Sequence, residues 1–143
     1  MINSKTIISF IIFYIFSLSL PVYAANPNSE LHNLNILFNP QLDRNTGFWR
    51  SELANKNREI RERDVTPRYT ATGSKKEKKA IMDEFYKIKL KNWEAVKTAC
   101  AAQKTKIYDQ LDLQRREIFK RYNKPFKPAY RRNNCYIPKP KYG

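Results

Sequence analysis

Residues 74–122 decide the fold, and they read SKKEKKAIMDEFYKIKLKNWEAVKTACAAQKTKIYDQLDLQRREIFKRY. The stretch contains no glycine and no proline, so nothing in it forces the backbone to break. Ser74 stands three residues before Glu77, which is the capping-box spacing that satisfies free backbone N–H groups at the start of a helix. We therefore expect one long helix over about residues 75–122.

Apolar side chains recur every 11 residues within this stretch. Eleven residues make almost three whole helical turns, so such side chains stay on one face of a nearly straight helix. The predicted packing stripe consists of Phe85, Ile88, Val96, Ile107, Leu111 and Ile118. A helical hairpin that turns near residues 98–105 is the alternative, but alanines and glutamine there favour helix. The pattern favours a continuous helix within a unit spanning residues 74–123.

The preceding residues 25–73 predict an N-terminal segment of short helices and a linker. A shorter helix that packs on the long one is expected over about residues 47–63. Residues 29–38 favour another short helix, which the Asn39-Pro40 pair would end because a residue before proline avoids helical dihedrals. Residues 64–73, with a proline and several threonines, are typical of a linker. The fold class is therefore mainly α.

The composition excludes several classes of protein. The chain has 143 residues, enough for one small domain, and its formal net charge is +15. Its three glycines cannot build a glycine-rich phosphate loop or a dinucleotide-binding fingerprint. Two cysteines and one histidine do not supply the four ligands of a structural zinc site. We expect neither a metal nor another cofactor.

The first 24 residues have the pattern of a secretory signal peptide. Lys5 gives a positive start, residues 7–20 are mostly apolar, and small residues precede a cleavage position after Ala24. An uncleaved membrane anchor is the alternative, but the apolar run is shorter than the ~20 residues that span a bilayer. The sequence predicts export to the periplasm or the extracellular space.

Export changes the interpretation of the two cysteines, because paired thiols in an oxidising compartment are usually structural. We expect a disulfide between Cys100 and Cys135. Residues 124–143 contain several prolines and predict an extended tail rather than a helix. The helix axis from Cys100 to its end measures ~33 Å and the 13 following residues can span ~43 Å, so the tail can fold back to Cys100.

The expected fold-back lays three aromatic side chains over three residues of the packing stripe. The aromatic side chains are Phe126, Tyr130 and Tyr136. The stripe residues beneath them are Ile107, Leu111 and Ile118.

The tail combines basic and aromatic residues without a single acidic one, a composition that suits polyanions and acidic surfaces. The candidate residues for binding a polyanion or a protein partner are Lys124, Lys127, Tyr130, Arg131, Arg132, Tyr136, Lys139 and Lys141. The alternative is that the tyrosines pack the tail onto the helix while the lysines keep it soluble.

No pattern indicates a catalytic site. His32 is the only histidine, and a lone histidine is more often a surface residue than a catalytic one. The carboxylates between residues 52 and 64 alternate with arginines, as on an ordinary solvated helix face. We expect a protein that is not an enzyme and that takes no small-molecule substrate.

The sequence LDLQRREI at residues 111–118 resembles the leucine-threonine-x-x-glutamine motif of small helical periplasmic stress chaperones. The threonine is absent here and the glutamine stands one position early. The resemblance covers these eight residues and implies no role for any of them.

The combined prediction is an exported, non-enzymatic binding or structural protein. Its most specific version is an accessory component of a cell-envelope or secretion-system assembly that docks through a basic helical surface. A periplasmic helical chaperone and a secreted polyanion-binding effector are the alternatives. The expected partner is an envelope protein or a second copy of the chain, with an anionic envelope polymer or lipid next and nucleic acid after these.

Overall fold

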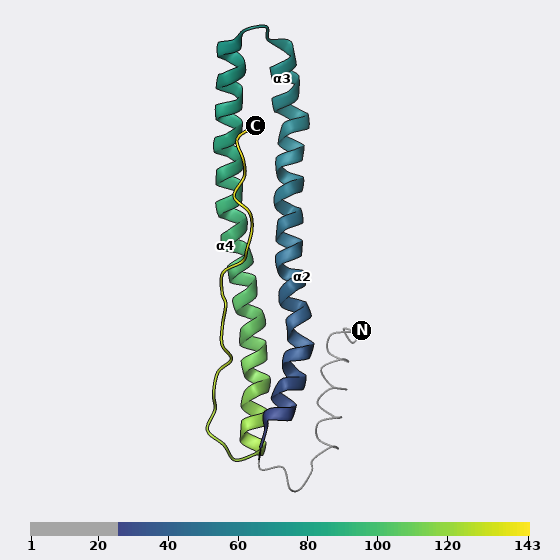
Figure 1. Cartoon of the computed structure of the whole chain (residues 1–143), viewed down its shortest axis with the longest axis vertical. Helices are drawn as coiled ribbons and strands as arrows, with labels where there is room; N and C mark the ends of the chain where they lie inside the picture. Colours follow the sequence, from purple (N-terminus) through teal and green to yellow (C-terminus); the bar gives the residue numbers. More distant parts are fainter. Residues whose placement is uncertain (1–25) are drawn as a thin grey trace, which may run out of the picture.

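The computed structural model describes residues 26–143. Its elements in chain order are α2 (Asn28–Ile60), the π-helical turn η1 (Arg61–Val65), α3 (Thr66–Ala71) and α4 (Lys75–Arg121). The first three follow one another without a break and form a rod antiparallel to α4, and the tail runs back along α4 (Figure 1). The predicted signal peptide lies outside the described residues.

The long helix predicted from the sequence is confirmed. α4 is one continuous helix of 47 residues, so the alternative of a turn near residues 98–105 is excluded. The Ser74 side chain caps α4 by accepting the Glu77 backbone N–H at 3.3 Å. Asn123, with φ of 53°, ends the helical run and turns the chain into the tail. Asparagine adopts this left-handed conformation more readily than most residues.

The second helix is much longer than predicted. It covers most of the expected residues 47–63, but it starts at Asn28 and contains Pro40, so the predicted break at Asn39-Pro40 is wrong. A proline inside a helix costs about 3 kcal/mol. Leu34 and Phe38 before the proline and Asn45 after it are all buried, so tertiary packing on both sides outweighs this cost. Pro40 itself is exposed. Proline has no backbone N–H to donate to the carbonyl oxygen four residues earlier, and at this surface position water can bind that oxygen instead.

The predicted linker over residues 64–73 is also wrong, because helix continues to Ala71 and only residues 72–74 form the turn. A π-helical turn accommodates an extra residue and changes the direction of the side chains after it. Val65 at the end of η1 is 5 % exposed and packs in one cluster with Ile81 and Phe85 of α4. Arg68 of α3 adds a two-pronged ion pair to Glu84, with distances of 3.1 and 3.3 Å.

The core is a narrow seam of three apolar clusters between the two rods. Four members of the predicted packing stripe are buried in it, namely Phe85, Val96, Leu111 and Ile118. Ile88 and Ile107 are half-buried at its margin. The seam also holds a buried polar residue beside the middle cluster. The Asn45 side chain donates to the Cys100 carbonyl oxygen at 3.2 Å. This bond satisfies the buried amide of Asn45 and links α2 to α4.

Candidate functional site

The tail is held by a disulfide and by a series of side chains along α4. The predicted bridge joins Cys100 to Cys135, with Cα atoms 6.1 Å apart. From Asp83 to Arg115 the helix rises about 48 Å, and the tail from Lys127 to Tyr142 spans about 50 Å when extended. Successive turns of α4 therefore meet successive tail residues along most of the helix.

The clamping side chains mostly donate to tail carbonyl oxygens, which have no neighbouring strand to bond with. Arg115 donates twice to Lys127 O, at 2.8 and 3.0 Å, and Trp93 Nε1 donates to Ile137 O at 2.8 Å. Further donors are Lys104 to Asn134 O at 3.1 Å and Arg50 of α2 to Tyr136 O at 2.9 Å. The tail is thus fixed chiefly through its backbone, which leaves many of its side chains available.

Asp112 of α4 is the main acidic anchor of the tail. Its carboxylate accepts the Ala129 backbone N–H at 2.9 Å and the Arg131 guanidinium at 2.6 Å. Burial acts to raise the pKa of Asp112, but the Ala129 N–H and Arg131 outweigh it, so this pKa lies below its ordinary value of 3.8. Arg131 also pairs with Asp109 at 2.8 Å. Although the sequence placed Arg131 among the partner-binding residues, its charge is already used within the molecule.

Protonation of Asp112 is expected to loosen the tail. A carboxyl group with a depressed pKa contributes stability above its unfolded value near 3.8, and the contribution is lost as pH falls through the folded pKa. The protection of the amides in residues 127–132 against hydrogen exchange, measured relative to the intrinsic exchange rate at each pH, should therefore fall below about pH 4 in the wild type. In Asp112→Asn the same amides should already exchange faster at neutral pH and respond less to acid. Equal acid responses in the two proteins would contradict this role.

The predicted packing of the three aromatic residues over the stripe is corrected by the structure. Tyr130 and Tyr136 point outward, with 83 % and 75 % of their surface exposed, and Phe126 packs edge-to-face on Phe119 at 6.2 Å. Alternate side chains of an extended chain point to opposite sides. Because the bridge directs Cys135 inward, Tyr136 faces outward and Ile137 enters the core.

Most of the other predicted binding residues are also exposed. We define the exposed tail strip as Lys124, Lys127, Tyr130, Arg132, Tyr136 and Lys139. Lys141 is exposed as well, while its backbone oxygen accepts a hydrogen bond from Lys89. Seven of the eight residues predicted from the sequence therefore present accessible side chains, and Arg131 is the exception.

Lys89 is a structural residue that the sequence analysis missed. It is 5 % exposed, and its ammonium donates to the backbone oxygens of Lys141 at 2.6 Å and Gly143 at 2.9 Å. The ammonium also lies 4.7 Å from the centre of the Phe85 ring. Burial, with a contribution from nearby Arg61, lowers the pKa of Lys89. The sequence does hold a sign of this burial, because Lys89 stands four residues after Phe85 and therefore lies on the same face of the helix.

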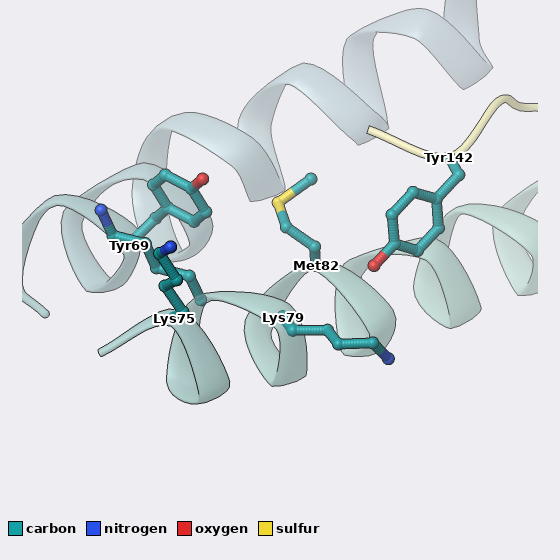
Figure 2. Close-up of a pocket in the computed structure, with 6 residues that line it drawn as sticks. Tyr69, Lys75, Lys79, Met82 and Tyr142 are labelled. Carbon is teal, nitrogen blue, oxygen red and sulfur yellow. The ribbon is translucent and has the colours of Figure 1, made fainter. Parts of the chain in front are cut away.

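A hollow of about 290 Å³ lies beside the turn, and we call it the turn-end hollow. It is lined by Tyr69, Lys75, Lys78, Lys79, Met82 and Tyr142. Figure 2 shows Met82 between the two tyrosines, with Lys75 beside Tyr69 and Lys79 reaching toward the side of Tyr142. These residues come from α3, the first turns of α4 and the end of the tail. The tail thus contributes one of the six lining residues, Tyr142.

Hydrogen bonds fix the Tyr142 side of this hollow. The Tyr142 hydroxyl donates to Asp83 Oδ1 at 2.6 Å, and Lys79 donates to Asp83 Oδ2 at 2.8 Å. The hydrogen bond to Asp83 raises the pKa of Tyr142. Tyr142 also meets the Tyr86 ring edge-to-face at 5.5 Å. The tail end therefore forms a defined wall of the hollow.

A second hollow, of about 450 Å³, lies at the other end of the hairpin. Its lining includes Arg116, Lys120 and Lys124 beside the rings of Phe119 and Phe126. Arg116 lies 4.0 Å from the centre of the Phe126 ring. These cations stand at the C-terminal end of α4, where they complement the negative end of the helix dipole. Helix stabilisation thus accounts for part of this charge.

Neither a metal centre nor a membrane span is found between residues 26 and 143. That part of the chain has no group of three or more histidine, cysteine, aspartate or glutamate residues placed to hold an ion. None of its helices is both long enough and apolar enough to cross a membrane. The carboxylates weighed as catalytic candidates include Glu59 and Asp64, which are exposed and pair with arginines four residues further on.

No protein family, curated protein or solved structure matches this chain.

Proposed function

We propose that this protein is an exported, non-enzymatic docking protein that binds an acidic partner protein in a cell-envelope or secretion-system assembly. The observation that carries the proposal is the exposed tail strip. Its tyrosines and basic side chains face outward while the backbone beneath them is clamped to α4. The alternative that the tyrosines serve mainly to pack the tail does not fit Tyr130 and Tyr136.

Clamping the strip favours binding because a rigid surface loses little conformational freedom on association. The Arg50 guanidinium stacks 5.3 Å from the centre of the Tyr136 ring and donates to the backbone of the same residue. Exposed tyrosines beside arginines are typical of residues that carry most of the energy of protein interfaces. The strip therefore has the composition and the rigidity of a docking surface.

Charge supports an acidic partner. The chain from Lys120 onward has eight basic residues and no acidic one, and the Arg131 charge is balanced by Asp109 and Asp112. Arg121 is likewise paired with Glu30, and the strip itself carries four exposed cations, namely Lys124, Lys127, Arg132 and Lys139. Such a surface attracts acidic partners over about 8–10 Å at physiological salt, and it speeds their association. The predicted leader and the disulfide support placing this encounter outside the reducing cytoplasm.

Photocrosslinking in the native cell tests the proposal. A photoreactive phenylalanine analogue at Tyr130 or Tyr136 should capture a small, reproducible set of envelope proteins. Adding Lys127→Glu and Lys139→Glu should reduce the yield about tenfold or more, because like charges then face an acidic partner. The same analogue at Phe48, which is 56 % exposed on α2, should capture little of this set.

A matched charge control is Lys91→Glu with Lys106→Glu, two exposed positions on α4 outside the strip. This pair changes the net charge equally and should leave the crosslinks largely intact. A heterogeneous spread of captured proteins would instead favour a chaperone. Capture of no protein, or an equal loss with the control pair, would overturn the proposed docking through the strip.

A further inference from the structure

The turn-end hollow has an unusual concentration of positive charge at the start of α4. Lys75, Lys76, Lys78 and Lys79 lie in the first turns of the helix, where the helix dipole disfavours cations. Lys79 gains an ion pair with Asp83 and Lys78 gains a contact with the Tyr69 ring, but within residues 26–143 nothing offsets this cost at Lys75. Local departures from such a preference are often found at functional sites.

The nearby carboxylates neutralise only part of this charge. Asp83 is shared between Lys79 and the Tyr142 hydroxyl, Glu84 is held by Arg68, and Glu77 accepts a hydrogen bond from the Thr72 hydroxyl. Within residues 26–143, the Lys75 ammonium forms no ion pair or hydrogen bond, and the Lys78 ammonium contacts only the Tyr69 ring, 5.1 Å away. Two ammonium groups at the hollow are thus available to a ligand.

The walls indicate what kind of anion would fit. Tyr69, Met82 and Tyr142 provide an apolar and aromatic surface beside the ammonium groups, as Figure 2 shows. The hollow is small, about 290 Å³, and is widely open to solvent, so a ligand of about one ring is the largest that it could contact on several sides. Sugar rings pack their C–H faces on tyrosine rings, and this packing would complement charge pairing at the lysines.

Lysine ammonium groups bind phosphate as compact point charges, while arginine binds phosphate and carboxylate alike through its planar fork. A phosphate monoester carries between one and two negative charges at neutral pH, so it gains more than a carboxylate from several ammonium groups. We propose that the turn-end hollow binds a phosphate monoester attached to a single sugar ring, with Lys75 and Lys78 contacting the phosphate and Tyr69 packing against the ring. This site does not use the exposed tail strip, so it stands apart from the docking function proposed above.

The test is a titration of the oxidised full chain with glucose 1-phosphate, inorganic phosphate and glucose, followed by amide chemical shifts. Glucose 1-phosphate should shift amides around residues 75–82 at low millimolar concentration or below, and more tightly than inorganic phosphate. Glucose should have no effect in this range. The pair Lys75→Ala and Lys78→Ala should weaken binding of both phosphates about tenfold, because two charge-assisted contacts are lost.

Two further variants separate a specific site from general attraction. Lys91→Ala with Lys106→Ala removes the same charge elsewhere on α4 and should change the affinity less than twofold. Tyr69→Ala should weaken glucose 1-phosphate several-fold and leave inorganic phosphate nearly unchanged. Equal losses in the two lysine pairs would overturn the site, as would shifts spread over the whole of α4. Binding of inorganic phosphate alone would overturn the sugar-ring part of the proposal.

Discussion

Phe85→Ala is expected to lower the free energy of unfolding by about 3–5 kcal/mol, which is the range for buried phenylalanines. Phe85 is 1 % exposed and is the largest of the fully buried side chains. It packs with Val65 of η1 and Ile81 of α4, and its ring faces both Arg61 at 5.6 Å and Lys89 at 4.7 Å. The cluster is small and lies at one end of a narrow seam, so few neighbours can fill the space left by the ring.

Urea unfolding followed by circular dichroism measures this effect. The control is Leu113→Ala, which removes an exposed leucine from the same helix and should change the free energy of unfolding by less than about 0.5 kcal/mol. A loss below about 1 kcal/mol in Phe85→Ala would show that the ring is not packed as the structure describes.

Removal of the disulfide is expected to cost about 3–4 kcal/mol, because the bridge closes a loop between residues 35 apart in the sequence. The variant is Cys100→Ala with Cys135→Ala. Cys100 is completely buried and Ala occupies less volume, so a small packing loss adds to the loss of the cross-link. The helix content should persist, since α2 and α4 pack directly on each other.

Hydrogen exchange of the tail amides gives the more specific readout for the disulfide. Residues 127–143 should lose protection well before the helices do. Without the cross-link, only the hydrogen bonds from the clamping side chains hold the tail against α4. Chemically reduced wild type serves as the control, since it lacks the bridge but keeps both sulfur atoms in place. Unchanged unfolding free energy and tail exchange in the reduced protein would refute the role assigned to the bridge.

The parts of the fold that could be predicted from sequence were those set by local pattern. The region of α4 has no helix breaker, an N-cap at Ser74 and an 11-residue apolar period, and all three features agree. The bridge from Cys100 to Cys135 followed from cysteine count and chain reach. Pro40 and the threonine-rich residues 64–73 gave misleading local signals, because tertiary packing against α4 keeps that segment helical.

The two candidate surfaces, the exposed tail strip and the turn-end hollow, could be predicted from the sequence to different degrees. The basic and aromatic residues of the tail were evident from composition, but their directions were not. Arg131 was predicted as a binding residue and is instead bound to Asp109 and Asp112. The turn-end hollow brings Tyr142 to Tyr69 and Lys75, which lie far from it in the sequence, and no local pattern connects them.

The sequence by itself determined the long helix, the cross-link and the positive charge of the tail, because helix propensity, cysteine pairing and ionisation depend on residue type and short-range spacing. Only the tertiary structure decided that α2 continues through Pro40, that Tyr136 faces outward and that Lys89 is buried. Each of these outcomes depends on the packing of α2 or the tail against α4. Contacts between distant segments outweigh local preferences of a few kcal/mol at such positions.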